Sequence, residues 1–182
     1  LEQWLCALPA PLVEQDPWLL YWLGASRAQR DPVSARGNME RAFELFSVRQ
    51  NKAGVLLAWA GVGDCIFYMY FDLTQFDPWI ARLDEMDDAQ LSFPSPVVEA
   101  KVSFSMFVAL AFRQPQHPKF GVWRSRLAAC AEATPDPMFR LLARLHLLIS
   151  QIWSGDLHGA GAALHELRRE SATRPSTPFV EL

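Results

Sequence analysis

Proline directly after a helix-capping residue recurs along this chain and predicts where its helices begin. A side-chain oxygen at the N-cap accepts hydrogen bonds from free amides of the first turn, and proline fits the next position because it has no N–H to satisfy. Six such starts in 182 residues predict an all-α protein. They are Asp16-Pro17, Asp31-Pro32, Asp77-Pro78, Ser95-Pro96, Asp136-Pro137 and Thr177-Pro178.

Apolar residues between these starts follow a helical period and show no strand alternation. In the segment from Pro32, for example, Ala35, Met39, Ala42 and Phe46 share one stripe. Segments 71–76 and 87–95 are expected to be loops. We predict a helix that ends near Leu8, followed by helices over 17–29, 32–50, 52–71, 78–87, 96–113, 119–133, 137–154 and 156–169.

The spacing of the helices predicts a repeat architecture. The first helices of successive pairs begin near residues 17, 52, 96, 137 and 178, and a period of 35–45 residues built from two antiparallel helices is typical of an α-solenoid. We therefore expect 1–182 to be one helical-repeat segment excised from a longer protein, with partial helices at both ends. Its pairs are expected near 17–50, 52–87, 96–133 and 137–169.

Composition argues against several classes of protein. Hydrophobic residues make up 51% of the chain and charged residues 20%, which is enough apolar material to bury a core. The net charge is −3 and the basic residues are scattered, so this segment is not expected to contact nucleic acid. The dispersed Cys6, Cys65 and Cys130 are expected to be buried thiols in a reducing compartment, which favours a cytoplasmic location.

The segment Ala53–Phe71 is apolar enough to raise the question of a membrane span. Its one charged residue, Asp64, would cost about 2.5–3.5 kcal/mol near the centre of a bilayer. A helix that is apolar on all sides is also expected in the middle layer of a soluble all-α protein. We predict the buried helix and no membrane contact.

The motifs that carry common chemistries are missing from the sequence. It contains neither the Gly-rich phosphate loop with its lysine nor the Gly-x-Ser-x-Gly turn of a nucleophilic serine. A third ligand at metal-binding spacing is lacking for the histidines, which are His117, His146, His158 and His165. We expect a non-catalytic protein without metal or cofactor.

Asp64 is the most unusual polar residue because it lies inside an apolar run. A buried carboxylate must be paired, protonated or facing a cavity, since burying it alone costs several kcal/mol. One interpretation is an ion pair with a neighbouring helix, with Lys101 or Arg144 as the partner. The other places Asp64 and Tyr68, one helical turn apart, on the wall of a binding groove. The candidate ligand-binding residues are therefore Asp64, Tyr68, Lys101 and Arg144.

Two stretches resemble tetratricopeptide-type repeats. "WLLYWLGASRAQRDPVSARGNMERAFELF", from Trp18 to Phe46, has Leu-Gly in its first helix and Ala-Phe in its second. "LHLLISQIWSGDLHGAGAALHELR", from Leu145 to Arg168, has a Gly-Asp turn followed by small and apolar residues at helical spacing. The region 52–133 departs from the repeat consensus because its intervals are longer and its first helix is more apolar. The resemblance implies a TPR-like superhelix.

The Trp-rich degenerate repeats, led by Leu8-Pro9 and then Pro17-Trp18-Leu19, resemble the helical-repeat region of MalT-like bacterial regulators, the large LuxR-type signal-transducing ATPases. The resemblance implies that this segment senses a small inducer or a partner protein and passes the signal to other domains of the same polypeptide. Neither the ATPase nor the DNA-binding role extends to these residues. The alternative is a structural spacer or self-association module without a small-molecule ligand.

Overall fold

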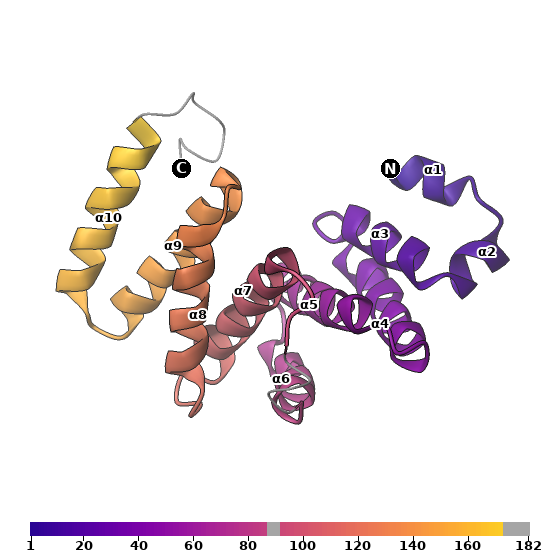
Figure 1. The fold of residues 1–182 in the computed structure, drawn as a ribbon, viewed down its shortest axis with the longest axis horizontal. Helices are drawn as coiled ribbons and strands as arrows, with labels where there is room; N and C mark the ends of the chain where they lie inside the picture. The colour runs from indigo at the N-terminus through magenta and orange to yellow at the C-terminus, as the bar shows by residue number, and fades with distance from the viewer. Residues whose placement is uncertain (87–91, 173–182) are drawn as a thin grey trace. The chain divides into compact units, whose positions relative to one another are not determined.

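The structure is a computed structural model that describes residues 1–86 and 92–172. It confirms the all-α prediction, with no strand in these two ranges (Figure 1). The helix start at Thr177 lies outside the described residues, as does most of the predicted loop 87–95. The elements are α1 (Glu2–Cys6), α2 (Ala10–Gln15), α3 (Pro17–Arg27), α4 (Pro32–Val48), α5 (Lys52–Met69), the 3-10 helix η1 (Leu73–Phe76), α6 (Asp77–Asp84), α7 (Pro96–Arg113), α8 (Phe120–Ala133), α9 (Pro137–Trp153) and α10 (Leu157–Ala172).

Four of the predicted caps are confirmed. Asp16 Oδ1 accepts from the backbone N–H of Trp18 at 2.8 Å and of Leu19 at 3.0 Å, and so begins α3. Asp31, Ser95 and Asp136 cap α4, α7 and α9 in the same way. The capping residue and the proline therefore fix these boundaries through local interactions that need no tertiary partner.

The cap predicted at Asp77 is wrong. The helix η1 runs directly into α6, so Phe76 takes the N-cap position and Asp77 already lies inside the helix. Its carboxylate instead accepts from the Arg113 guanidinium at 2.7 Å and from the Gln114 amide at 2.8 Å. η1 itself lies in the segment that was predicted to be a loop, and Asp72 caps it. The short helix α2 was also missed.

The described chain divides into two compact units, Leu1–Trp123 and Arg124–Leu182. In the first unit the largest contacts join α3 to α4, α4 to α5, and α5 to α7, while α1 and α2 both pack on α3 (Figure 1). α8 begins in the first unit and continues in the second from Arg124 onward. The single array expected over 1–182 stays a prediction.

Glycines on α3 and α5 let α4 approach both helices closely. A Cβ on Gly61 would lie 2.6 Å from Met39 Sδ, and a Cβ on Gly54 would lie 2.2 Å from Phe46 Cδ1. As α4 runs from Met39 to Phe46, its contacts on α5 therefore run backward from Gly61 to Gly54. The two helices are antiparallel and packed closer than side chains on both would allow.

Side-chain contacts also show the directions of α3 and α7 relative to their neighbours. Phe46 packs edge-on against Trp18 with ring centroids 4.7 Å apart, while Ala35 lies beside Gly24, so α3 and α4 are also antiparallel. In contrast, α5 and α7 run in the same direction. Ser105 lies beside the Ala60 carbonyl and Phe112 packs on Phe67 seven residues further along both helices.

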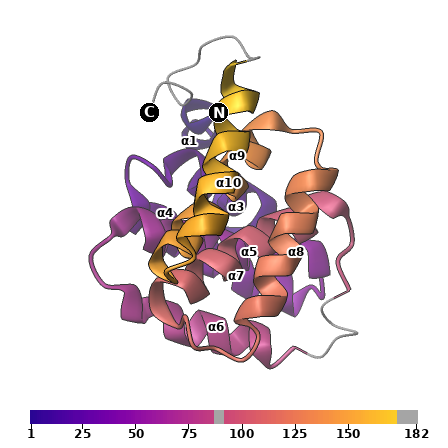
Figure 2. The ribbon, with the colours of Figure 1, turned by 90° about the vertical axis from the view of Figure 1, so that its left-hand side faces the viewer.

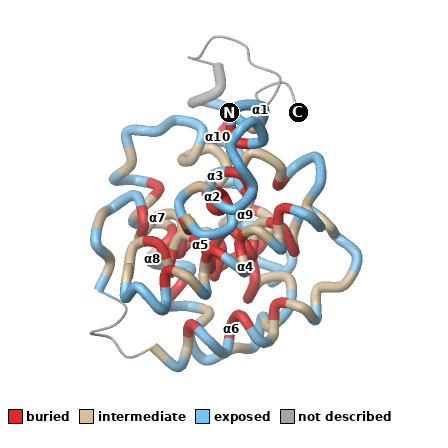
Figure 3. Tube along the Cα trace, turned by 90° about the vertical axis from the view of Figure 1, so that its right-hand side faces the viewer, coloured by how far each residue is buried: buried red, intermediate tan, exposed pale blue. Residues whose placement is uncertain are grey.

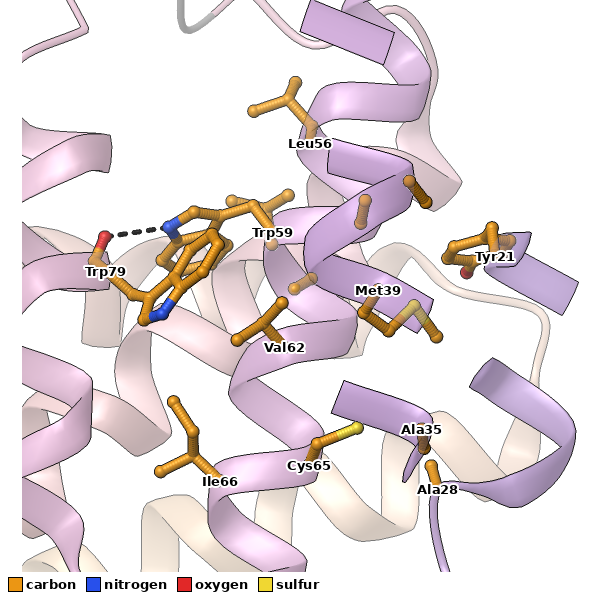
Figure 4. Close-up of a cluster of buried hydrophobic side chains, with 14 of the residues drawn as sticks. Tyr21, Ala28, Ala35, Met39, Leu56, Trp59, Val62, Cys65, Ile66 and Trp79 are labelled. Atoms are coloured by element: carbon orange, nitrogen blue, oxygen red, sulfur yellow. Dashed lines mark hydrogen bonds between the residues drawn. The ribbon is translucent and has the colours of Figure 1, made fainter. Parts of the chain in front are cut away.

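The core of the first unit lies between α4 and α5 and extends to α6 and α7 (Figure 3). Its largest fully buried side chain is Trp59, which faces Trp79 from α6 (Figure 4). The Trp59 indole N–H donates to the Trp79 carbonyl at 2.8 Å, so the polar edge of a buried ring is satisfied. This bond fixes where α6 lies against α5.

The second unit contains a helix pair, α9 and α10, which lie side by side (Figure 2). Its apolar contacts are centred on Leu148, Ala160 and Leu167. Gly155 joins the two helices with φ +80°, a left-handed conformation that favours glycine, and Asp156 then accepts from the Gly159 N–H at 2.9 Å. The Gly-Asp turn is thus a helix stop followed by a helix start.

α5 is the one helix in the described ranges that is long and apolar enough to cross a membrane by length and composition, and 56% of it is buried inside the protein. The prediction that all three cysteines are buried is only partly right. Cys65 is buried and Cys130 is half-buried, but Cys6 is exposed at the end of α1, where the Arg27 guanidinium lies 3.1 Å from its sulfur.

Candidate functional site

A pocket of about 350 Å³ lies in the first unit, between α3, α4, α5 and α7. Its volume is at the lower end of the range for small-molecule sites. Apolar residues, among them Ala28, Met39 and Gly61, form part of its wall, and three of the four candidate site residues line it. Those three are Asp64, Tyr68 and Lys101.

Helix geometry brings Asp64 and Tyr68 into the pocket. Gly61, Asp64 and Tyr68 are spaced by three and four residues and therefore share one face of α5. Lys101 comes from the first half of α7, which runs alongside α5 in the same direction. The pocket wall is thus assembled from residues 37 positions apart in the sequence, Asp64 and Lys101.

Asp64 and Lys101 form an ion pair through a short hydrogen bond from Lys101 Nζ to Asp64 Oδ2. The other carboxylate oxygen lies 3.3 Å from the hydroxyl of Ser105. Burial disfavours the charge on Lys101, but the attraction and hydrogen bond of Asp64 outweigh it, so the pKa of Lys101 is raised above its usual value. Lys101, rather than Arg144, is the ion-pair partner that the structure gives Asp64.

Two tyrosines complete the polar part of the pocket. Tyr21 comes from α3 and is buried. Burial raises its phenol pKa, Lys101 opposes this rise and Asp64 adds to it, so the phenol stays protonated and can donate a hydrogen bond. Tyr68 is 43% exposed, which places it where the pocket meets solvent.

The rim of the pocket is tied to the N-terminal helix. Arg30 lines the pocket after the end of α3, and its guanidinium forms a short ion pair with Glu2 on α1. Glu2 also accepts from Arg27 Nε at 2.8 Å. The hydrogen bond from Arg27 is the largest cause of the lowered pKa of Glu2, and the positive charge of Arg30 adds to it. One carboxylate therefore positions two arginines.

Arg144 does not belong to this pocket. It lies on α9 in the second unit, where its guanidinium donates to Glu132 at 2.7 Å. There it lines a separate pocket of about 390 Å³ formed by residues of α8, α9 and α10. The set proposed from the sequence therefore divides into three residues that share a pocket and one that does not.

Sequence reasoning missed Tyr21, Arg30 and Met39 as pocket residues. Tyr21 and Met39 belong to helices whose apolar pattern predicts only a core face, and Arg30 lies in the turn after α3. Gly24 and Gly61 carry the signal that could have found them, because small residues on α3 and α5 flank Met39 of α4 and draw the three helices together.

In the described residues no group of three or more His, Cys, Asp or Glu side chains could hold a metal ion. The pocket instead offers hydrogen-bonding groups, one internal ion pair and an apolar wall, which suit the reversible binding of a small molecule. Comparisons with protein-family models, with curated proteins and with solved structures gave no match.

Proposed function

We propose that this chain is a non-catalytic sensing segment, built as a TPR-like α-solenoid, that binds a small ligand or a partner protein. In this proposal it belongs to a cytoplasmic bacterial regulator of transcription or signalling that resembles the MalT-like, LuxR-type proteins. Its partners are other domains of the same polypeptide and the inducer or protein that it senses.

The directions of the helices in the first unit support the repeat architecture. α3 and α4 are antiparallel, α4 and α5 are antiparallel, and α5 and α7 run in the same direction. This is the order expected if α3, α5 and α7 are the first helices of three successive pairs, with η1 and α6 forming a shortened second helix. Such arrays bury a continuous core and leave a concave surface for recognition.

The observation that carries the proposed function is the origin of the pocket residues. Tyr21 comes from α3, Asp64 and Tyr68 from α5, and Lys101 from α7. Each proposed first helix therefore contributes a polar group to one pocket. A ligand that contacts all three would stabilise one relative arrangement of the pairs, and attached domains would respond to that change in population.

Calorimetry with candidate inducers and with neighbouring domains tests the proposal, with Asp64→Asn as the informative variant. We expect saturable binding to the native chain and a changed affinity in the variant, with melting temperatures recorded for both. If the variant loses stability while its affinity stays the same, Asp64 has only a structural role. A complete lack of binding to every inducer and domain would count against sensing.

A second candidate function, self-association, is favoured by exposed aromatic residues at the end of α5. Tyr70 is 65% exposed and Phe71 is 93% exposed, and Tyr70 continues a cluster with Phe67 and Phe112. Large exposed apolar side chains that adjoin one another often mark protein interfaces. Stable dimers in light scattering without ligand, lost in Phe71→Ser, would support a spacer or assembly role.

A further inference from the structure

We propose that the pocket between α3, α5 and α7 takes a small organic anion, with a carboxylate as its charged group and a short aliphatic chain as its body. This proposal rests on the proposed function insofar as the pocket is taken to be a ligand site. It adds the chemical class of the ligand, which follows from the charge and hydrogen-bonding groups of the residues that line the pocket.

The charged residues that line the pocket carry more positive than negative charge. Lys101 and Arg30 line the pocket as cations, and Asp64 is the one carboxylate among the lining residues. Glu2, the described partner of Arg30, lies outside that lining, and the Arg30 side chain is 72% exposed. A positively charged ligand would meet two cations and a carboxylate that is already paired, whereas an anion would meet an excess of positive charge.

The hydrogen-bonding groups of these charged residues are unbalanced as well. An ammonium has three N–H donors and a guanidinium has five, whereas the described contacts show one bond from Lys101 to Asp64 and one from Arg30 to Glu2. On Asp64, one oxygen accepts from Lys101 and the other lies 3.3 Å from the Ser105 hydroxyl. On these three charged side chains, spare donors thus outnumber spare acceptors, which favours a ligand rich in acceptors.

Part of the pocket wall is apolar. Ala28 and Met39 are buried and line the pocket together with Gly61, which has no side chain. These groups offer a hydrophobic surface beside the two cations and no further charge. A short aliphatic body would bury against them while its carboxylate reaches Lys101 and Arg30.

The test is a titration followed by the backbone amide resonances of the full chain, with three probes of equal length: hexanoate, hexanamide and hexylammonium. We expect hexanoate to give saturable shifts at residues of α3, α5 and α7, with a dissociation constant on the order of 1 mM for so small a ligand. Hexanamide should bind at least about tenfold more weakly, because it lacks the charge-assisted hydrogen bonds. Hexylammonium should give no saturable shift.

Two arginine variants make the test specific. Arg30→Gln should weaken hexanoate binding about tenfold, whereas Arg41→Gln, which removes an exposed arginine outside the pocket lining, should leave it unchanged. Lys101→Met is the stronger variant, and its melting curve shows whether it folds. Because Arg30 is largely exposed, Arg30→Gln keeps the test valid even if Lys101→Met unfolds.

The outcomes separate this inference from the proposed function. If hexanamide binds as tightly as hexanoate at the same residues, the pocket binds ligands but the anion preference is wrong. Equal weakening by Arg30→Gln and Arg41→Gln would mean that hexanoate responds to the overall charge, which also overturns the inference. If none of the probes shifts the pocket residues, the assigned ligand class is overturned, while binding of an inducer or domain in calorimetry would still support sensing.

Discussion

Replacing Gly54 by alanine should destabilise the protein, whereas the same replacement at Gly37 should stabilise it. A Cβ at position 54 would lie 2.2 Å from Phe46 Cδ1, far inside van der Waals contact. Phe46 is fully buried and its ring packs on Trp18, so it has no room to move away. At Gly37, which is exposed on α4, nothing lies within 4 Å of the added methyl group.

Two opposing contributions set the change in unfolding free energy, overpacking and helix propensity. Overpacking a tight core costs about 1–3 kcal/mol, and the severity of this contact places Gly54→Ala near the upper end. Alanine gains about 1 kcal/mol over glycine in helix propensity. The net result at Gly54 is a loss of about 2 kcal/mol, while Gly37→Ala gains about 0.5–1 kcal/mol because only the propensity term acts.

Urea unfolding followed by circular dichroism measures the change in unfolding free energy of both variants, and thermal unfolding measures their melting temperatures. For a chain of this size we expect Gly54→Ala to lower the melting temperature by about 4–8 °C and Gly37→Ala to raise it by about 1–4 °C. The urea dependence of the unfolding free energy should not change, because the same surface is exposed on unfolding. Stabilisation by both variants would show that α4 and α5 do not approach as closely as the structure has them.

Four further predictions concern Trp59, the cysteines and His146. Trp59→Phe should cost about 2–3 kcal/mol in urea unfolding, because it removes the hydrogen bond to the Trp79 carbonyl and leaves a void. Thiol labelling at pH 8 should modify Cys6 in the native protein but Cys65 only on unfolding. Burial raises the pKa of Cys65 from 9.0 to about 12. The stabilisation that comes from keeping this thiol neutral in the folded protein is therefore complete below pH 9 and is lost as the pH rises toward 12. Cys65→Ala should flatten that alkaline loss of stability. Burial lowers the pKa of His146 below 6.5. The stabilisation that comes from keeping this imidazole neutral in the folded protein is therefore present above pH 6.5 and is lost as the pH falls through the folded-state pKa. His146→Gln should flatten the loss of unfolding free energy, measured by urea unfolding, below pH 6.5.

Most helix boundaries could be predicted because their causes are local. Asp16, Asp31, Ser95 and Asp136 cap the amides two or three residues ahead, and neither the cap nor the proline needs a tertiary partner. α2 escaped prediction because its N-cap is Pro9, which has no side-chain oxygen. Helix boundaries without a side-chain cap leave no such signal in the sequence.

The misassigned cap at Asp77 has a different origin. The sequence Asp-Pro-Trp is the same as at Asp16, but here a 3-10 helix already supplies the helical turn before it. Asp77 is then free to bind Arg113 and Gln114, which lie 36 and 37 residues further along the chain. A local sequence pattern cannot indicate these long-range contacts of Asp77.

The candidate site was predictable only where local sequence determines it. Asp64 stood out because a charge in an apolar run needs a partner, and Lys101 was one of two cations considered for it. The choice between Lys101 and Arg144 depends on the direction in which α7 passes α5, which is a tertiary property. Tyr21 and Arg30 become pocket residues only through the packing of α3 beside α5, and the one trace of that packing in the sequence is the pair of small residues Gly24 and Gly61 that flank Met39.

The pocket draws on α3, α4, α5 and α7, and in the proposed repeat architecture this sets a rule for how such a chain can lengthen or shorten without losing it. All its lining residues fall between Tyr21 and Lys101. Duplicating or deleting a pair after α7 would leave every wall in place, whereas deleting α1 would remove Glu2 from Arg30, and one extra pair inserted between α5 and α7 would carry Lys101 away from Asp64. Copy-number variation should therefore be tolerated after α7 and forbidden within the interval.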